Sequence, residues 1–192
     1  MISGIILASG FSKRMEQEKL LLPVGGIALV ERVMRAAQAS HLDEVILIYQ
    51  KEEIEKIGRK YGIPAVYNSR ADEGQSAAIK LGINTAHPET DAFLFMVGDQ
   101  PFLNPSTINI LIDTFQQDPH SIIVPVYNNT RGNPVLFPSG MKELLLALDG
   151  DRGGRVLIEK MPDRVKLVNI DEELAGADID TREDYLRIKD NN

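Results

Sequence analysis

A loop of small residues followed by two cations comes directly after the first apolar run. The segment comprises residues 7–15, with small residues at 8–10 and Arg14 near its end, and Lys19 comes four residues after it. Small residues let a backbone turn sharply and bring its N–H groups close to a ligand. Arg14 would then bind phosphate as a planar fork and Lys19 as a point charge. An ordinary turn with two solvated cations stays open, because the loop matches neither GxxxxGKS/T nor GxGxxG.

Carboxylates at two places could hold a divalent cation. Asp99 follows the apolar segment 93–97, and Asp178 and Asp180 lie on one side of an extended segment before the last predicted helix. Mg²⁺ usually takes one or two carboxylates completed by water and phosphate oxygens. A turn at Asp99, and helix capping around Asp180, are the alternatives.

A third group of polar residues opens a predicted helix. Gly74 and Ser76 follow Asn68, and the segment is a near match to the G-x-S-x-G nucleophile motif. A hydrolase is rejected, because Ala78 replaces the last glycine and the preceding strand ends too early, at Tyr67. Two interpretations of this segment remain: helix capping, or contact with a nucleobase through short polar side chains.

Two loops in the second part of the chain combine glycine with arginine. They cover residues 131–134 and 150–155. Glycine permits close backbone approach, and arginine recognises anions. Composition alone identifies these segments only as loops.

The elements that must position these residues alternate between strands and helices. Apolar runs bounded by turn residues suit strands buried on both faces. Residues with helical spacing lie between them, and Asn104 and Pro105 form the start signal of one such helix. The predicted strands are 2–8, 44–49, 65–67, 92–97 and 121–126, with weaker candidates at 134–137 and 165–170. This order predicts an α/β fold with an open, mostly parallel sheet and helices on both faces, and ligands beyond the carboxyl ends of its strands.

Length and composition limit the classes of protein. The chain has 192 residues, no Cys, and 21 Lys plus Arg against 28 Asp plus Glu, a net charge of −7. Thiol chemistry is excluded, and a nucleic-acid partner is disfavoured. No apolar run approaches the roughly 20 residues of a membrane helix, and the first positive charge, Lys13, follows the N-terminal apolar run instead of preceding it. We expect a cytoplasmic protein of one domain, 1–192, with no membrane partner.

Taken together, the motifs resemble those of the nucleotidyltransferases of the molybdenum cofactor family. The family pattern LAAGxSxRMGxxKLLLP is matched by LASGFSKRMEQEKLLLP at residues 7–23. GDQP follows at 98–101, RGxP at 131–134, GDxGxR at 150–155 and DIDTxxDY at 178–185. The resemblance covers nearly the whole chain. It implies a Rossmann-like three-layer fold with a mostly parallel mixed sheet, similar to that of nucleotide-diphospho-sugar transferases.

The resemblance also implies roles for individual residues. Arg14, Lys19 and Asp99 would be catalytic. Asp99 would hold Mg²⁺ or Mn²⁺ with Asp180 as the second carboxylate, and Asp178 is the alternative to Asp180. The nucleotide would meet Leu7, Ala8, Ser9, Gly10, Arg14, Lys19, Asn68, Gly74, Ser76 and Asp99. The acceptor would meet Gln100, Arg131, Asn133, Asp151 and Arg155. Residues 1–127 would thus form the nucleotide-binding part and residues 128–192 the acceptor-binding part.

Within this family the chain is most similar to the molybdenum cofactor cytidylyltransferases. LASG and GDQP favour CTP over GTP, although Ser9 replaces the second alanine of the family pattern. The implied reaction transfers a cytidylyl group from CTP to the phosphate of molybdopterin, with a molybdenum hydroxylase or dehydrogenase receiving the product. Use of GTP, a sugar or alditol phosphate acceptor, a non-catalytic cofactor carrier and a flavodoxin-like regulatory domain are the alternatives.

Overall fold

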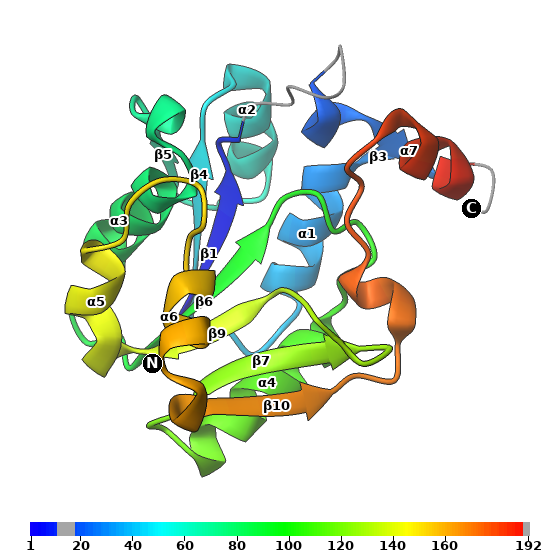
Figure 1. Cartoon of the computed structure of the whole chain (residues 1–192). Coiled ribbons are helices and arrows are strands. Elements are labelled where there is room, and N and C mark those ends of the chain that lie inside the picture. Colours follow the sequence, from blue (N-terminus) through cyan, green and yellow to red (C-terminus); the bar gives the residue numbers. More distant parts are fainter. Residues whose placement is uncertain (11–17, 190–192) are drawn as a thin grey trace.

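The computed structural model describes residues 1–10 and 18–189. Its centre is an eight-stranded sheet with the order β10-β7-β9-β6-β1-β4-β5, and β8 pairs with β7 at one end (Figure 1). The strands are β1 (Ile2–Ala8), β4 (Glu44–Tyr49), β5 (Ala65–Tyr67), β6 (Ala92–Val97), β7 (Ile122–Tyr127), β8 (Thr130–Arg131), β9 (Val135–Pro138) and β10 (Val165–Asn169).

Helices cover both faces of this sheet (Figure 1). One face packs on α1 (Leu29–Gln38), α2 (Glu52–Lys60) and α4 (Pro105–Gln117). The other packs on α3 (Gln75–Thr85), α5 (Lys142–Leu146) and α6 (Arg155–Lys160). The predicted three-layer arrangement is therefore confirmed.

Strand β6 illustrates how the sequence builds these two cores. Leu94 and Met96 join the core under α1, α2 and α4, whereas Phe93 and Phe95 join the core under α3, α5 and α6. Side chains alternate between the faces of a strand, so a strand covered on both faces must be apolar throughout. Burial of each large apolar side chain contributes about 1.5–3 kcal/mol to folding.

Strand β9 makes the sheet mixed. β1 pairs in parallel with β4 and β6, and β10 pairs in parallel with β7. β9 lies between β6 and β7 and is antiparallel to both. The loop that precedes β9 therefore lies at the same edge of the sheet as the carboxyl ends of the parallel strands. We call this edge the carboxyl edge.

Two smaller elements complete the fold. β2 (Pro23–Val24) and β3 (Ile27–Ala28) form an antiparallel hairpin that the apolar pattern did not predict, because two-residue strands show no periodicity. α7 (Arg182–Lys189) packs beside β2. None of the helices in the described ranges combines the length and hydrophobicity needed to cross a bilayer.

Candidate active site

The loops after β1 and β6 leave the sheet side by side at the carboxyl edge. Leu7 pairs with Val97 in the parallel register, and the Gly98 N–H donates to the Leu7 carbonyl at 3.2 Å. Ser9 and Gly10 therefore face the segment that carries Asp99. Two of the sequence motifs meet here because adjacent parallel strands end together.

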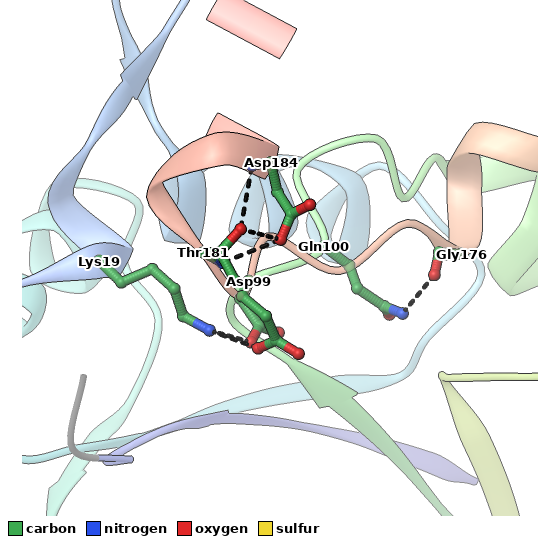
Figure 2. A network of polar contacts seen from close by, with 7 residues as sticks. Lys19, Asp99, Gln100, Gly176, Thr181 and Asp184 are labelled. Carbon is green, nitrogen blue, oxygen red and sulfur yellow. Dashed lines mark hydrogen bonds and ion pairs between the residues drawn. The ribbon is translucent and has the colours of Figure 1, made fainter. Parts of the chain in front are cut away.

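Lys19 connects two carboxylates at this edge. Its Nζ lies 2.7 Å from Asp99 Oδ2 (Figure 2). The same Nζ lies 3.2 Å from Asp180 Oδ1. The side chains of Lys19 and Asp99 are 14% and 20% exposed, whereas that of Asp180 is 52% exposed. Burial disfavours the ammonium, but the two carboxylates outweigh this effect and raise the pKa of Lys19. Lys19 is therefore a fixed positive charge at neutral pH.

Local contacts hold Asp180 in place. The Ile179 N–H donates to the Asp99 carbonyl at 3.1 Å, which joins the two carboxylate segments through the backbone. Thr181 and Asp184 then cap α7 reciprocally, with Asp184 N–H donating to Thr181 Oγ1 and Thr181 N–H donating to Asp184 Oδ2 (Figure 2). Capping thus accounts for Thr181 and Asp184 but not for Asp180.

The carboxylate pair fits a divalent cation that also binds phosphate. Asp99 Oδ1 is buried and has no hydrogen-bond partner among residues 1–10 and 18–189. Within those residues no three His, Asp or Glu side chains gather to form a complete metal site. Mg²⁺ is commonly bound by one or two carboxylates together with waters and substrate phosphates. Asp99 and Asp180 supply such an incomplete set.

Asp178 lies apart from the Lys19 ion pairs and faces the larger of two cavities. Burial raises the pKa of Asp178 to about 6, and the negative charges of Asp99 and Asp180 contribute to the same shift. A hydrogen bond from Gln100 opposes it. The position of Asp178 indicates a different role from that of Asp180.

The smaller cavity, of about 290 Å³, lies over β1 and β6 at the carboxyl edge. It brings together most of the predicted nucleotide-binding residues, and Asp72, Gln75 and Asp151 add polar groups to its wall. The predicted residues that line it are Leu7, Ser9, Gly10, Lys19, Gly74 and Asp99. Arg14 lies outside the described residues.

Three predicted nucleotide-binding residues lie behind the wall of this cavity. Ala8 and Asn68 are buried, and Asn68 Nδ2 donates to Ser9 Oγ at 2.9 Å. Ser76 is also buried, because its side chain points into the protein from the first turn of α3. Its backbone N–H donates to the Gly150 carbonyl at 3.1 Å. Gln75, which belongs to the same segment but was not among the predicted nucleotide-binding residues, lines the cavity instead of Ser76.

Gly74 allows the loop at 150–155 to pack on the start of α3. Its φ is +90°, and a Cβ placed there would lie 2.5 Å from Asp151 Oδ1 and 2.7 Å from the Gly150 backbone. Both the backbone conformation and the lack of space therefore exclude a side chain.

Gly74→Ala is expected to lower the free energy of unfolding by roughly 1–3 kcal/mol, through backbone strain and forced displacement of the 150–155 loop. Urea unfolding measures this effect. Gly140→Ala is the matched control, because a Cβ at Gly140 meets nothing within 4 Å. Equal stability of the two variants would contradict the assigned packing.

The larger cavity, of about 1010 Å³, adjoins the smaller one and shares Leu7, Gln75, Val97 and Asp151 with it. Its apolar surface includes Phe95 and Phe137. Four of the five predicted acceptor-binding residues line it, namely Arg131, Asn133, Asp151 and Arg155.

The arginines of the larger cavity differ in their partners. Arg152 and Arg155 both pair with Glu159, the latter at 3.0 Å. Arg131 forms no ion pair with any residue in the described ranges and is therefore the cation best placed for an anionic ligand.

Gln100, the fifth predicted acceptor-binding residue, lines neither cavity. Its side chain is fully buried, and Nε2 donates to the Gly176 carbonyl at 3.2 Å, pointing away from Asp99 (Figure 2). The difference arises because the segment before α7 folds over Gln100, a long-range contact that motif spacing does not reveal.

Comparison with known proteins identifies the family. The MobA-like NTP transferase domain matches residues 4–165. The chain is similar to the purine catabolism protein PucB of Bacillus subtilis, with 29% identity covering 97% of this chain and 95% of PucB. It is 27% identical to nicotine blue oxidoreductase of Paenarthrobacter nicotinovorans, covering 97% and 96%. A probable molybdenum cofactor guanylyltransferase of Thermococcus kodakarensis is 33% identical, covering 74% and 69%.

Solved structures agree with this assignment. Rv0371c of Mycobacterium tuberculosis superposes with a TM-score of 0.86 at 26% identity, covering 98% of this chain and 97% of that one. A complex of Rv0371c with manganese superposes with a TM-score of 0.82 at 25% identity, covering 100% and 99%. The predicted nucleotide-diphospho-sugar transferase-like fold is confirmed. The chain, which carries Asp99 in the wall of the smaller of two adjoining cavities, belongs to the MobA-like NTP transferase family and is a nucleotidyltransferase of that family.

Proposed function

We propose that this nucleotidyltransferase transfers a cytidylyl group from CTP to the phosphate of molybdopterin, or of the molybdenum cofactor, and releases pyrophosphate. The observation that carries the proposal is that two cavities share a wall that includes Val97, and Asp99, two residues further along the chain, lines the smaller of them. A nucleotide in the smaller cavity and an acceptor in the larger one would meet at a site that can hold a divalent cation.

The larger cavity favours a ring-shaped acceptor over a sugar or alditol phosphate. Its surface combines the aromatic residues Phe95 and Phe137 with polar groups such as Asn133. Ligand sites of this kind bind apolar or aromatic bodies and orient them with a few polar contacts. A pterin covers such a surface, and Arg131 is positioned to bind its phosphate.

The residues of the chain account for the chemistry by positioning and by charge. A phosphate oxygen of the acceptor forms a bond to the α-phosphorus of CTP, while the bond from that phosphorus to the bridging oxygen breaks and pyrophosphate leaves. Lys19 stabilises the negative charge that develops on the leaving group. The attacking phosphate is already anionic at neutral pH, so no general base is required. Asp99 and Asp180 would hold Mg²⁺ or Mn²⁺, which neutralises phosphate charge when bound.

The contact between Ser9 and Asn68 supports CTP as the nucleotide. Because Ser9 Oγ accepts a hydrogen bond from Asn68, its own proton is free to be donated into the smaller cavity. Cytosine presents two acceptors, O2 and N3, side by side, whereas the corresponding edge of guanine presents one acceptor, O6, beside the donors N1–H and N2–H. A donor at this position therefore favours the pyrimidine.

The direct test measures pyrophosphate release by the purified protein with Mg²⁺. CTP, GTP, ATP and UTP are each supplied with and without molybdopterin. Release that requires both CTP and molybdopterin supports the proposal. Release with GTP instead of CTP would show that the nucleotide substrate is GTP. Binding of molybdopterin without any pyrophosphate release would favour a cofactor carrier. Pyrophosphate release only with a sugar or alditol phosphate would show that this compound, and not molybdopterin, is the acceptor.

Ser9→Gly is expected to lower the ratio of kcat/KM for CTP to kcat/KM for GTP by roughly tenfold, because the donor is lost and room for a purine is gained. Steady-state kinetics with both nucleotides measure the ratio. Ser9→Ala separates the two causes, since it removes the hydroxyl but keeps most of the volume. An unchanged ratio in Ser9→Gly would show that base selection lies elsewhere.

The proposed product fixes the class of the next partner. A pterin dinucleotide is a cofactor and must be transferred to an apo-enzyme, for which a molybdenum hydroxylase or dehydrogenase is the proposed recipient. We further propose that residues 128–192 supply most of the acceptor contacts. Gln75 and Phe95 of the first part line the same cavity, so the two parts form one functional unit.

A further inference from the structure

Tyr127 connects the loop before β9 with the segment before α7. It ends β7, its side chain is 7% exposed, and its hydroxyl donates to the Asn133 carbonyl at 2.8 Å. Its ring packs with Ile170 and Ala175 on the other side. Tyr127 is not itself among the residues that line either cavity.

Two glycines leave room for the ring of Tyr127. A Cβ at Gly132 would lie 2.8 Å from Cδ2 and Cε2 of the ring, and one at Gly176 would lie 2.3 Å from Cδ2. Neither glycine has a positive φ, so the backbone does not require glycine at these positions. Each glycine instead allows its segment to approach the ring closely. The acceptor-side loop and the segment before α7 thus pack on the same edge of one side chain.

The second of these segments is tied to the carboxylates. The Gly176 carbonyl accepts a hydrogen bond from Gln100, the neighbour of Asp99 (Figure 2). Asp178 follows two residues later, and the Ile179 N–H donates to Asp99. A continuous set of contacts therefore runs from Asn133 through Tyr127 and Gly176 to the start of the metal-binding segment.

The environment keeps Tyr127 a hydrogen-bond donor. Burial, together with the nearby charge of Asp178, raises the pKa of the Tyr127 hydroxyl above its usual value. The hydroxyl is therefore protonated throughout the range in which the protein is expected to work.

We propose that Tyr127 is a positioning residue that sets the acceptor-side loop, residues 131–133, at a fixed distance from Asp99 and Asp180. The inference rests on the proposed function, because it takes the larger cavity as the acceptor site. Tyr127 acts on the acceptor through Asn133 and Gly132 and makes no contact with the nucleotide cavity. Loss of the Tyr127 hydroxyl should therefore raise the KM for the acceptor and leave the KM for the nucleotide unchanged.

The experiment compares Tyr127→Phe with wild type in pyrophosphate release from CTP and molybdopterin. Loss of one neutral hydrogen bond is expected to raise the KM for molybdopterin by roughly 5- to 10-fold, with the KM for CTP unchanged. Tyr185→Phe is the matched control, since its hydroxyl also donates to a backbone carbonyl, that of Pro23 at 2.7 Å, and its side chain is 9% exposed. The control should lose similar stability without the change in molybdopterin KM.

A second measurement does not depend on the acceptor. In Tyr127→Phe, amide hydrogens of residues 130–133 and 174–178 should exchange faster together, while those of α3 exchange as in wild type. Tyr185→Phe should leave both segments unchanged. If wild type shows no turnover with CTP and molybdopterin, the proposed function fails, and hydrogen exchange still decides whether Tyr127 couples the two segments.

Gly176→Ala provides an independent perturbation from the opposite segment. The added methyl group overlaps the ring of Tyr127 and should raise the molybdopterin KM more than the CTP KM, whereas Gly140→Ala should alter neither. The inference is overturned if Tyr127→Phe leaves the molybdopterin KM unchanged, if both KM values rise equally, or if the two segments keep their exchange rates.

Discussion

Asp99→Asn is expected to lower kcat for pyrophosphate release by about 1000-fold, the largest effect of any single substitution considered in the site. The amide keeps the size of the carboxylate but loses its charge and one acceptor. In the structure Asp99 Oδ2 contacts Lys19, and the buried Oδ1 has no partner among the described residues. Oδ1 is therefore available to a cation, and Oδ2 holds the lysine that stabilises the leaving group. Steady-state release of pyrophosphate at saturating CTP and Mg²⁺ measures the loss.

The same substitution removes one of the two carboxylates that contact Lys19 among residues 1–10 and 18–189. We expect a loss of about 1 kcal/mol in the free energy of unfolding, because the charge-assisted contact with Asp99 becomes a weaker one. Asp91→Asn is a control for loss of an ion pair away from the site, since Asp91 pairs with the N-terminal ammonium at 2.6 Å. Full activity in Asp99→Asn would refute the metal assignment, whereas loss of activity in Asp91→Asn would point to a general effect on the fold.

Lys19→Met is expected to change turnover and metal binding in opposite directions. Turnover should fall by about 100- to 1000-fold, because the charge that stabilises the leaving pyrophosphate is lost. Binding of Mn²⁺ without nucleotide should tighten by roughly tenfold, because the ammonium now beside Asp99 and Asp180 competes with a cation for the same carboxylates. Titration with Mn²⁺, followed by the electron paramagnetic resonance of the free ion, measures the affinity.

Lys19→Arg is the matched control for charge. It keeps the cation and should therefore not tighten Mn²⁺ binding, although the larger planar group will not restore full turnover. Weaker Mn²⁺ binding in Lys19→Met would show that Lys19 supports the metal site instead of competing with it. Unchanged turnover would reduce Lys19 to a structural ion pair.

The strands could be predicted from sequence because burial on both faces leaves a strong local signal. Phe93 to Val97 is apolar at every position, and the structure places alternate residues in separate cores. The cap at Asn104 is equally local, since its side chain accepts from Thr107 three residues later. Both features depend on residues that are neighbours in the chain, and both are confirmed.

The position of β9 could not be predicted in the same way. β9 pairs with β6, which lies about 40 residues earlier in the chain, and with β7. No local sequence pattern indicates whether β9 is parallel or antiparallel to these strands. Gln100 and Ser76 show the same limit. Each belongs to a motif, yet each is buried because a distant segment, around Gly176 or Gly150, covers it.

Tyr127 shows why part of the site escapes motif analysis. It belongs to none of the motifs, and only its contacts with Asn133, Gly132 and Gly176 link it to the site. Gly132, in the motif at 131–134, and Gly176, two residues before the motif at 178–185, are explained by this ring and not by the backbone turns that glycine usually indicates. A large side chain facing two glycines that lack positive φ is a signal visible only in three dimensions.

The wall residues common to both cavities have a kinetic consequence. Leu7, Gln75, Val97 and Asp151 would contact the nucleotide and the acceptor in turn, so the joined product touches both cavities at once. A molecule that fills two adjoining sites pays the cost of immobilisation only once and binds more tightly than either half. Product release, and not bond formation, is then the step that a protein accepting the product could accelerate most. A stable compound joining the two halves would be a strong inhibitor.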